Sequence, residues 1–297
     1  MTAARLTAIV LLSVLMASVG CNPAPDTVEN IGPEAFVSIP PLAFFARRIA
    51  GQHVTVNVLI KPGANPHTYA PTSKQIVRLN RGGLLICAGS GFEQIISSRL
   101  KWADGGLRIV NVAEGLGGQP HGAHNHHAAD AHDHGDDDRH VWMSPRIAKM
   151  LAAAVCRELC TLDPPRSNDY QNNLVKLQAD LDKLDARLSE ALAPLKGKTL
   201  FVFHPAFGHF AKAYGLKQEA VESQGKSPGP KHITELIARA KAAGAKVIFV
   251  QPQFSQRSAE IIAKRIGGRV VPLDPLSGDY INNLEHIAEE FQKALAP

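Results

Sequence analysis

SNDYQNNLVKLQADLDKLDARLSEALAPL, residues 167–195, carries the longest periodic pattern in the chain. Its leucines recur at spacings of three and four, which places them on one face of an α-helix. They are Leu174, Leu177, Leu181, Leu184, Leu188, Leu192 and Leu195. At 1.5 Å per residue, a helix over about 167–194 would be roughly 40 Å long. One small lobe does not need such a length, so we expect a rod that packs along two lobes.

Short β-rich runs alternate with helical patterns on both sides of this segment. Before it, the β-rich runs are AFVSI at 35–39, VTVNVLI at 54–60, LLICA at 84–88 and LRIVNV at 107–112. After it, they lie at 199–203, 217–222, 246–250 and 269–273, with helical patterns near 206–214, 232–243, 256–266 and 280–295. Such alternation is typical of βαβ units with a parallel sheet. The sequence therefore predicts an α/β fold with two parallel-sheet lobes bridged by one long helix: an N-terminal lobe at 34–165, the linking helix at 166–196 and a C-terminal lobe at 197–297.

The N-terminus has the layout of an export signal. Arg5 precedes an apolar run at 6–19, and small residues lead into Cys21. The run is shorter than the roughly 20 residues that a bilayer span needs. Its end resembles the lipobox of bacterial lipoproteins, although Ser18 stands where that pattern usually has Leu. We therefore expect a signal peptide at 1–20, a tether at 21–33 and a lipid anchor on Cys21, outside the cytoplasm.

Composition excludes several classes of protein. Hydrophobic residues make up 45% of the chain and charged residues 20%, so a large core can form and global disorder is excluded. The net charge of +5 is modest, and no Lys/Arg cluster is interleaved with aromatic residues, so nucleic-acid binding is not expected. Cys87 is expected in the core, while Cys156 and Cys160 are four apart in a helical segment and give only a weak metal signal. Disulfides are not expected to hold the fold together.

Three histidines and one aspartate share a placement after predicted strands. His67 follows the second strand, His204 comes directly after the run at 199–203, His140 follows the fourth strand and a long loop, and Asp279 follows the last strand. Ligands bind at the carboxyl ends of parallel strands, so these side chains can converge between the lobes. Three imidazole nitrogens and a carboxylate suit Zn²⁺ at about 2.0–2.2 Å. Each residue also has another reading: a histidine after a strand can be a hinge or core residue, and Asp279 can simply cap a helix.

Four motifs resemble those of the ABC-transporter solute-binding proteins for zinc and manganese. They are PGANPHTYAP (62–71), RHVWMSP (139–145), FHPAFGHFAKAYGL (203–216) and LSGDYINNL (276–284). The resemblance runs from about residue 33 to the C-terminus and implies two α/β lobes bridged by a long helix. It implies the metal ligands His67, His140, His204 and Asp279, although some zinc-binding members have water or another carboxylate in place of Asp279. His209 replaces an aromatic residue that often follows the third motif, so we expect it behind the ligands or on the surface.

The tract at 121–140 holds seven of the chain's 13 histidines and five aspartates. Its small, polar residues cannot bury a core, so the loop at 119–139 is expected to be disordered without metal. Similar tracts are found in the zinc-specific branch of the family that the motifs resemble. His140 is assigned to the fixed site, and the other six form weak, exchangeable sites that raise the local metal concentration. These six are His121, His124, His126, His127, His132 and His134. The alternative is a solvated linker with no role in metal binding.

The resemblance and the ligand chemistry together predict a binding protein and not an enzyme. We expect a monomer that captures Zn²⁺ outside the cytoplasm and delivers it to an ABC permease of the inner membrane. Imidazole ligands favour zinc over Mn²⁺, which prefers oxygen, without excluding manganese. Acidification below about pH 6 is expected to release the metal by protonating imidazoles. Two alternatives are a manganese- or iron-binding member with an adhesin role and a secreted zinc hydrolase; against the hydrolase, the chain lacks H-E-x-x-H.

Overall fold

The computed structural model describes residues 32–81, 83–89, 93, 96, 106–116, 138–222 and 229–295. Gly32–Pro297 forms one compact unit, to which the following description applies. The expected signal peptide, Cys21 and the six tract histidines lie outside the described residues, as do residues 90–105 except 93 and 96. Within the described ranges, no helix has the length and apolar character that crossing a membrane requires.

The first lobe is built on a four-stranded parallel sheet with the order β2-β1-β3-β4. Its strands are β1 (Glu34–Val37), β2 (Thr55–Val58), β3 (Leu84–Cys87) and β4 (Arg108–Asn111). Its helices are α1 (Pro40–Ala50), α2 (Ser73–Arg81) and α4 (Pro145–Leu162). Prolines at the first turns of α1 and α4 suit helix starts, because these positions need no hydrogen-bonding N–H. The four strands of this lobe thus overlap the four predicted β-rich runs before the long helix.

The second lobe repeats this architecture with the order β6-β5-β7-β8, again all parallel. Its strands are β5 (Thr199–Val202), β6 (Lys217–Ala220), β7 (Val247–Val250) and β8 (Arg269–Pro272). Its helices are α6 (Gly208–Ala213), α7 (Pro230–Ala242), α8 (Gln256–Arg265) and α9 (Tyr280–Leu295). Successive residues of β5 face opposite sides of the sheet. Leu200 and Val202 therefore belong to the large core, whereas Phe201 and Phe203 pack in a separate cluster with residues of α7 and α8.

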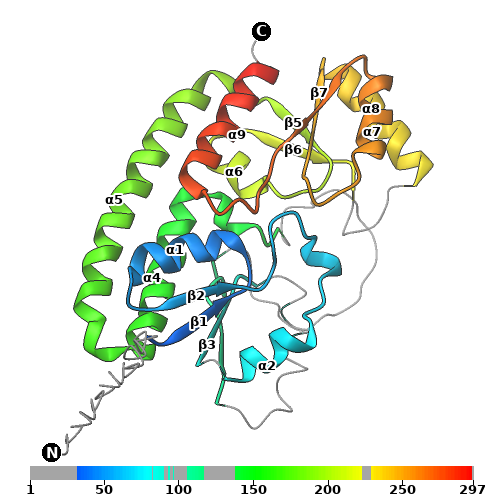
Figure 1. Ribbon diagram of the computed structural model, residues 1–297. Helices are drawn as coiled ribbons and strands as arrows, with labels where there is room; N and C mark the ends of the chain where they lie inside the picture. The colour runs from blue at the N-terminus through cyan, green and yellow to red at the C-terminus, as the bar shows by residue number, and fades with distance from the viewer. Residues whose placement is uncertain are drawn as a thin grey trace, which may run out of the picture. The chain divides into compact units, whose positions relative to one another are not determined.

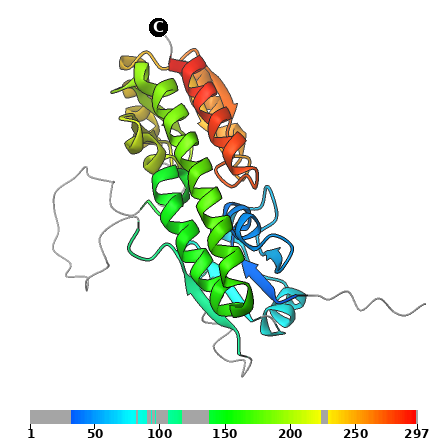
Figure 2. The same ribbon diagram turned by 90° about the vertical axis from the view of Figure 1, so that its left-hand side faces the viewer.

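The long helix α5 (Ser167–Leu192) packs along both lobes, as predicted from its leucines (Figures 1 and 2). It contacts α1 and α4 of the first lobe and α9 of the second. Leu177, Leu181, Leu184, Leu188 and Leu192 are all buried. The helix ends in a 3₁₀ turn at Ala193–Leu195, where Pro194 cannot continue the α-helical hydrogen bonding. The α/β fold with two parallel sheets and one long bridging helix is thus confirmed.

The two lobes also meet directly through aromatic side chains. Tyr280, at the start of α9, stacks on Phe44 with ring centroids 5.5 Å apart and meets Phe45 edge-on at 4.9 Å. The hydroxyl of Tyr280 donates to the backbone O of Trp142 at 2.6 Å. The indole N–H of Trp142 in turn donates to the backbone O of Pro275 at 2.8 Å. One hydrophobic core therefore runs from the first sheet to α9, and separating the lobes would expose it.

We predict that Leu181→Ala destabilises the protein by about 2–5 kcal/mol, because it leaves a cavity at the centre of the leucine face. Val175→Ala on the same helix is the matched control, since Val175 is 66% exposed. Its effect should stay within about 0.5 kcal/mol. Urea unfolding of both variants measures the difference, and equal stabilities would contradict the assignment of this face to the core.

Candidate metal centre

Three histidines meet where the carboxyl ends of the two sheets face each other. His67 lies in a 3₁₀ turn (Pro66–Thr68) after β2, and its backbone N–H donates to Oδ1 of Asn65 at 2.8 Å. His140 precedes a second 3₁₀ turn, η2 (Val141–Met143), that leads into α4. His204 lies two residues after the end of β5. The predicted convergence of these imidazoles is therefore present in the structure.

The spacing of the ring nitrogens suits one tetrahedral metal ion. Nε2 of His204 lies 3.2 Å from Nε2 of His67 and 3.4 Å from Nε2 of His140. Two nitrogens bound to one Zn²⁺ at about 2.0–2.1 Å with a tetrahedral angle lie about 3.3 Å apart. Among the described residues, these three form the only group of three or more His, Cys, Asp or Glu side chains whose ligand atoms all lie within 4.8 Å.

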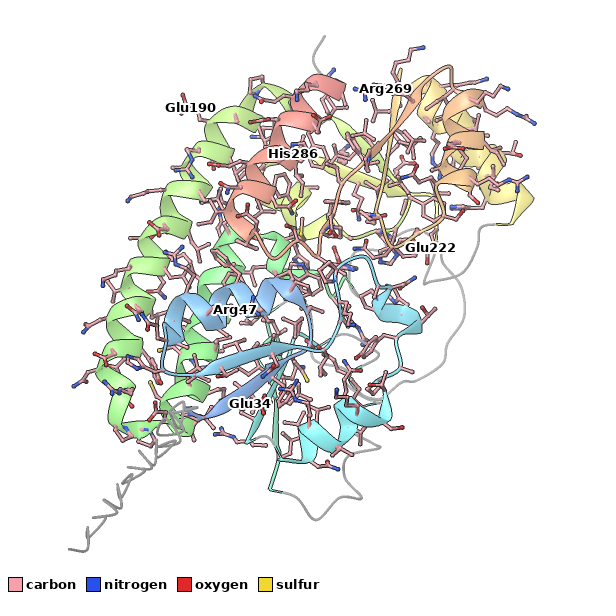
Figure 3. The ribbon with its side chains drawn as sticks, viewed as in Figure 1. Glu34, Arg47, Glu190, Glu222, Arg269 and His286 are labelled. Atoms are coloured by element: carbon pink, nitrogen blue, oxygen red, sulfur yellow. The ribbon has the colours of Figure 1, made fainter. Side chains whose placement is uncertain are left out.

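His204 is buried and fixed from several sides. Its Nδ1 lies 3.1 Å from Oε2 of Glu222, which follows β6 in the second lobe (Figure 3). Its backbone N–H donates to the side chain of Gln251 at 3.2 Å, and the amide of Gln251 donates back to its carbonyl at 2.7 Å. The Phe254 ring stacks on the imidazole at 4.8 Å between centroids. Because Nδ1–H faces the carboxylate, the lone pair of Nε2 points to the cluster.

His140 is held by a carboxylate of its own. Its Nδ1 lies 2.7 Å from Oδ1 of Asp138, and the same oxygen accepts the backbone N–H of His140 at 2.9 Å. The ring of Trp142 packs edge-on against the imidazole at 5.3 Å. Two ligand histidines are therefore backed by carboxylates, an arrangement that fixes the ring orientation and makes Nε2 a better donor to a metal.

Burial and mutual repulsion keep the imidazoles of His67 and His204 neutral. Desolvation, with further lowering from His204 and His140, brings the pKa of His67 from 6.5 to about 4. Burial also lowers the pKa of His204. For Asp138, burial raises the pKa, but the hydrogen bonds and charge of His140 outweigh it, and the pKa ends below its ordinary value. At neutral pH His67 and His204 therefore offer unprotonated nitrogens, and at these two rings protons compete with a metal only at a lower pH than at a free imidazole.

Asp279, the expected fourth ligand, is not brought to the three imidazoles. It is exposed, and both of its carboxylate oxygens accept hydrogen bonds from the amide of Asn282, at 3.1 and 2.9 Å. Its backbone carbonyl accepts the N–H of Asn283 at the start of α9. Asp279 thus fits the alternative reading, a helix-start residue.

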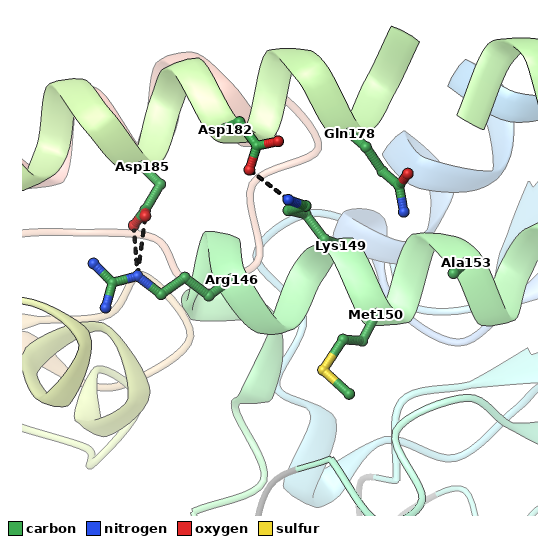
Figure 4. Close-up of a pocket in the computed structure, with 7 residues that line it drawn as sticks. All are labelled: Arg146, Lys149, Met150, Ala153, Gln178, Asp182 and Asp185. Carbon is green, nitrogen blue, oxygen red and sulfur yellow. Dashed lines mark hydrogen bonds and ion pairs between the residues drawn. The ribbon is translucent and has the colours of Figure 1, made fainter. Parts of the chain in front are cut away.

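A pocket of about 60 Å³ opens beside the cluster. Its lining residues other than the three histidines are Pro66, Arg139, Trp142, Gln253, Phe254, Pro275 and Leu276. A larger hollow of about 330 Å³ lies between α4 and α5, but its charged groups pair with each other (Figure 4). There, Lys149 contacts Asp182 at 2.5 Å and Arg146 contacts Asp185 at 3.0 Å. Available donor chemistry, and not size, therefore makes the small pocket the candidate metal site.

Sequence reasoning missed the side chains that support the ligands. Glu222 was recognised only as the last residue of a predicted strand, and Asp138 only as one aspartate of the acidic tract. Phe254 and Gln251 follow β7, and their position at a strand's carboxyl end was the available signal. His209 was expected behind the ligands or on the surface. Its Nε2 lies 2.7 Å from the backbone O of Asp138, so it contacts the segment that carries His140.

The fold and the cluster define a bilobal metal-binding protein. Its two lobes share a core, and three imidazoles cluster between their sheets. The family model described as zinc-uptake complex component A, periplasmic (ZnuA), matches residues 36–294, and the chain belongs to this family. The high-affinity zinc uptake system protein ZnuA of Yersinia pestis is 28% identical over 294 residues, covering 90% of this chain and 92% of the relative. A crystal structure of ZnuA has a TM-score of 0.80 at 33% identity and covers 89% of this chain and 100% of that chain. A ZnuA deletion mutant with zinc bound has a TM-score of 0.80 at 32% identity and covers 90% and 99%.

The lowered pKa of His67 predicts how metal-free protein responds to acid. The folded pKa of about 4 lies below the ordinary 6.5, so between these values the unfolded chain binds a proton that folded His67 does not. The free energy of unfolding should therefore decrease as the pH is lowered from about 6.5 to about 4. His67→Asn should make this decrease smaller, and His286→Asn, on the exposed face of α9, is the matched control.

Urea unfolding in the presence of a chelator measures the pH dependence, and an NMR titration follows His67 directly. An imidazole that titrates near pH 6.5, together with an unchanged slope in His67→Asn, would contradict the description of the cluster as neutral.

Proposed function

We propose that this protein captures Zn²⁺ with His67, His140 and His204 and delivers it to an ABC permease. The observation that carries the proposal is the spacing of 3.2 and 3.4 Å between the ring nitrogens, which matches a tetrahedral metal. Membership of the zinc-uptake family supports both capture and delivery. Three protein ligands leave a fourth position, which faces the small pocket and takes water or another small ligand.

Zinc is the favoured metal because of the donor atoms. Three imidazole ligands suit Zn²⁺, Cu²⁺ and Ni²⁺ better than Mn²⁺, which prefers oxygen ligands. Since intrinsic affinity alone would favour copper, geometry and metal supply must decide in favour of zinc. A relative of this chain that carries a deletion has been solved with zinc bound, which supports zinc as the cargo.

A zinc hydrolase is the second candidate, because three histidines and an open position also describe a catalytic zinc. Such an enzyme needs a general base beside the metal-bound water. The nearby carboxylates of Asp138 and Glu222 each contact the Nδ1 of a ligand histidine, on the side of the ring remote from the metal position. They therefore support ligands, and the arrangement favours binding over catalysis. No observation favours an adhesin role.

Metal binding is expected to proceed with limited movement of the lobes. The helix α5 packs against both lobes, and Tyr280 joins α9 to α1 and to Trp142. Hinge closure would have to break this packing, so the site is proposed to be largely preformed. A preformed site orders little on binding and can bind more tightly than a flexible chain of histidines.

The fixed site is proposed to bind zinc without the histidine tract, which lies outside the described residues. Deletion of residues 119–137 leaves Asp138 and His140 in place, and this variant should retain about one zinc per chain after dialysis at pH 7.5. His204→Ala in the same background should abolish retention, whereas His126→Ala in the full-length chain should change the affinity little. Mass spectrometry of the dialysed proteins measures the metal content of each variant. Loss of zinc on deletion would make the tract the binding element and overturn the proposal.

Export and lipid attachment at Cys21 are proposed from the N-terminal sequence. Cys21→Ser should move the protein from the membrane fraction to the soluble extracytoplasmic fraction when expressed in a bacterium that processes lipoproteins. Cys156→Ser is the matched control, because Cys156 is buried in α4 and should leave fractionation unchanged. Continued membrane association of Cys21→Ser would contradict lipidation.

A further inference from the structure

Two residues at the start of α6, Gly208 and His209, contact Asp138 from the opposite lobe. We propose that they form a seat for Asp138, and that this seat sets the orientation of the ligand His140. The proposal rests on the proposed function, because its main consequence is for zinc affinity. Neither residue contacts the metal position, so both act as positioning residues through Asp138.

Asp138 is the direct support of His140. A single oxygen, Oδ1, accepts both the ring Nδ1–H and the backbone N–H of His140. The Asp138 side chain is only 14% exposed, so water competes little for this oxygen. Any rotation of the carboxylate would weaken both bonds together and release the imidazole from its orientation. The position of the carboxylate is therefore what the seat must fix.

Gly208 allows the carboxylate to approach the backbone of α6. A Cβ atom at position 208 would collide with Oδ2 of Asp138 and lie 3.4 Å from its Cγ. The backbone of Gly208 is not in the left-handed region, so its conformation does not require glycine. The close approach of Asp138 is thus the reason for a residue without a side chain at this point.

His209 and Gln218 fix the other parts of the seat. Nε2–H of His209 donates to the backbone O of Asp138 at 2.7 Å, which holds the main chain two residues before His140. The start of α6 is itself attached to β6, because the N–H of Phe207 donates to Oε1 of Gln218 at 2.8 Å. The helix also packs against the 3₁₀ turn η2 that follows His140. The second lobe thereby orients a ligand of the first, and the complete site depends on docking of the two lobes.

A double-mutant cycle in the full-length protein tests the seat. Gly208→Ala should displace the Asp138 carboxylate and weaken zinc binding by about 10-fold, at the lower end of the 10- to 100-fold range for residues that support metal ligands. Asp138→Ala should weaken binding by a similar or larger factor. Adding Gly208→Ala to Asp138→Ala should cause no further loss, because the group it displaces is already absent. Competition titration with a zinc chelator measures each affinity.

Matched controls separate positioning from folding. Gly229→Ala should leave affinity unchanged, since its Cβ would meet nothing within 4 Å and its φ is −71°. Alanine favours helix over glycine, so Gly208→Ala should not weaken α6 itself, which urea unfolding of metal-free protein checks. His209→Gln retains an N–H donor and should bind more tightly than His209→Phe, which does not. Comparison of these two His209 variants tests the seat even if Gly208→Ala fails to fold.

NMR of the His140 ring nitrogens gives a readout that does not depend on zinc. Wild-type protein should show a protonated Nδ1, and Gly208→Ala should change this signal while His286→Asn does not. Equal affinities and spectra for wild type and Gly208→Ala, or additive losses in the double mutant, would overturn the seat. If wild-type protein binds no zinc but Gly208→Ala still changes the His140 signal, the proposed function is contradicted and the seat stands.

Discussion

The leucine face of α5 must be buried against both lobes at once, and the rest of the structure depends on this constraint. Each fully buried leucine contributes about 1.5–3 kcal/mol relative to an exposed one. The helices that cover this face are α1 and α4 from the first lobe and α9 from the second. Neither lobe alone can bury the whole face, so folding brings the lobes together. The carboxyl ends of their sheets are thereby held opposite each other, and these ends carry the histidines.

The electrostatics of the cluster follow from that frame. Burial near other imidazoles disfavours protonation of His67 and His204, so their nitrogens stay available to a metal. Burial would also favour protonation of Asp138, but the hydrogen bonds from His140 reverse the effect. The result is that His67 and His204 are neutral, and carboxylates lie behind the rings of His140 and His204. A divalent cation between the rings therefore meets uncharged donors and nearby negative charge, at little cost in rearrangement.

Sequence patterns predicted the frame and the three imidazoles because both follow local rules. The spacing of the leucines gives α5, and a histidine after a strand of a parallel sheet lies at the ligand-binding edge. Asp279 obeys the same rule but does not join the cluster. The loop before it is attached to the first lobe by a hydrogen bond between Trp142 and Pro275, residues 133 positions apart in sequence. No sequence pattern near Asp279 encodes that contact, so local patterns could not predict where the Asp279 side chain lies.

The sequence also does not show which carboxylates support the histidines. Asp138 follows two other aspartates in the tract, and only its contact with Gly208 and His209 distinguishes it from them. Glu222 follows a strand whose partner, β5, carries His204. Its role becomes visible only once the register of the two strands is known. Residues that support a metal ligand show no characteristic spacing in the sequence, since their position is set by the ligand that they hold.

Metal preference follows from the lining of the pocket as much as from the ligands. Around the three nitrogens, the described lining is largely apolar, with Phe254 and Leu276 on its walls. The amide of Gln253 is engaged with Asp274 at 2.8 Å, so its orientation is already fixed by another partner. Ions such as Mg²⁺ or Mn²⁺ prefer several oxygen ligands. This pocket offers few oxygen atoms to replace their bound water, so it would bind these ions weakly. Zn²⁺ needs only four ligands and accepts three nitrogens with one small molecule. The apolar walls of the pocket therefore also restrict which cation the histidines can hold.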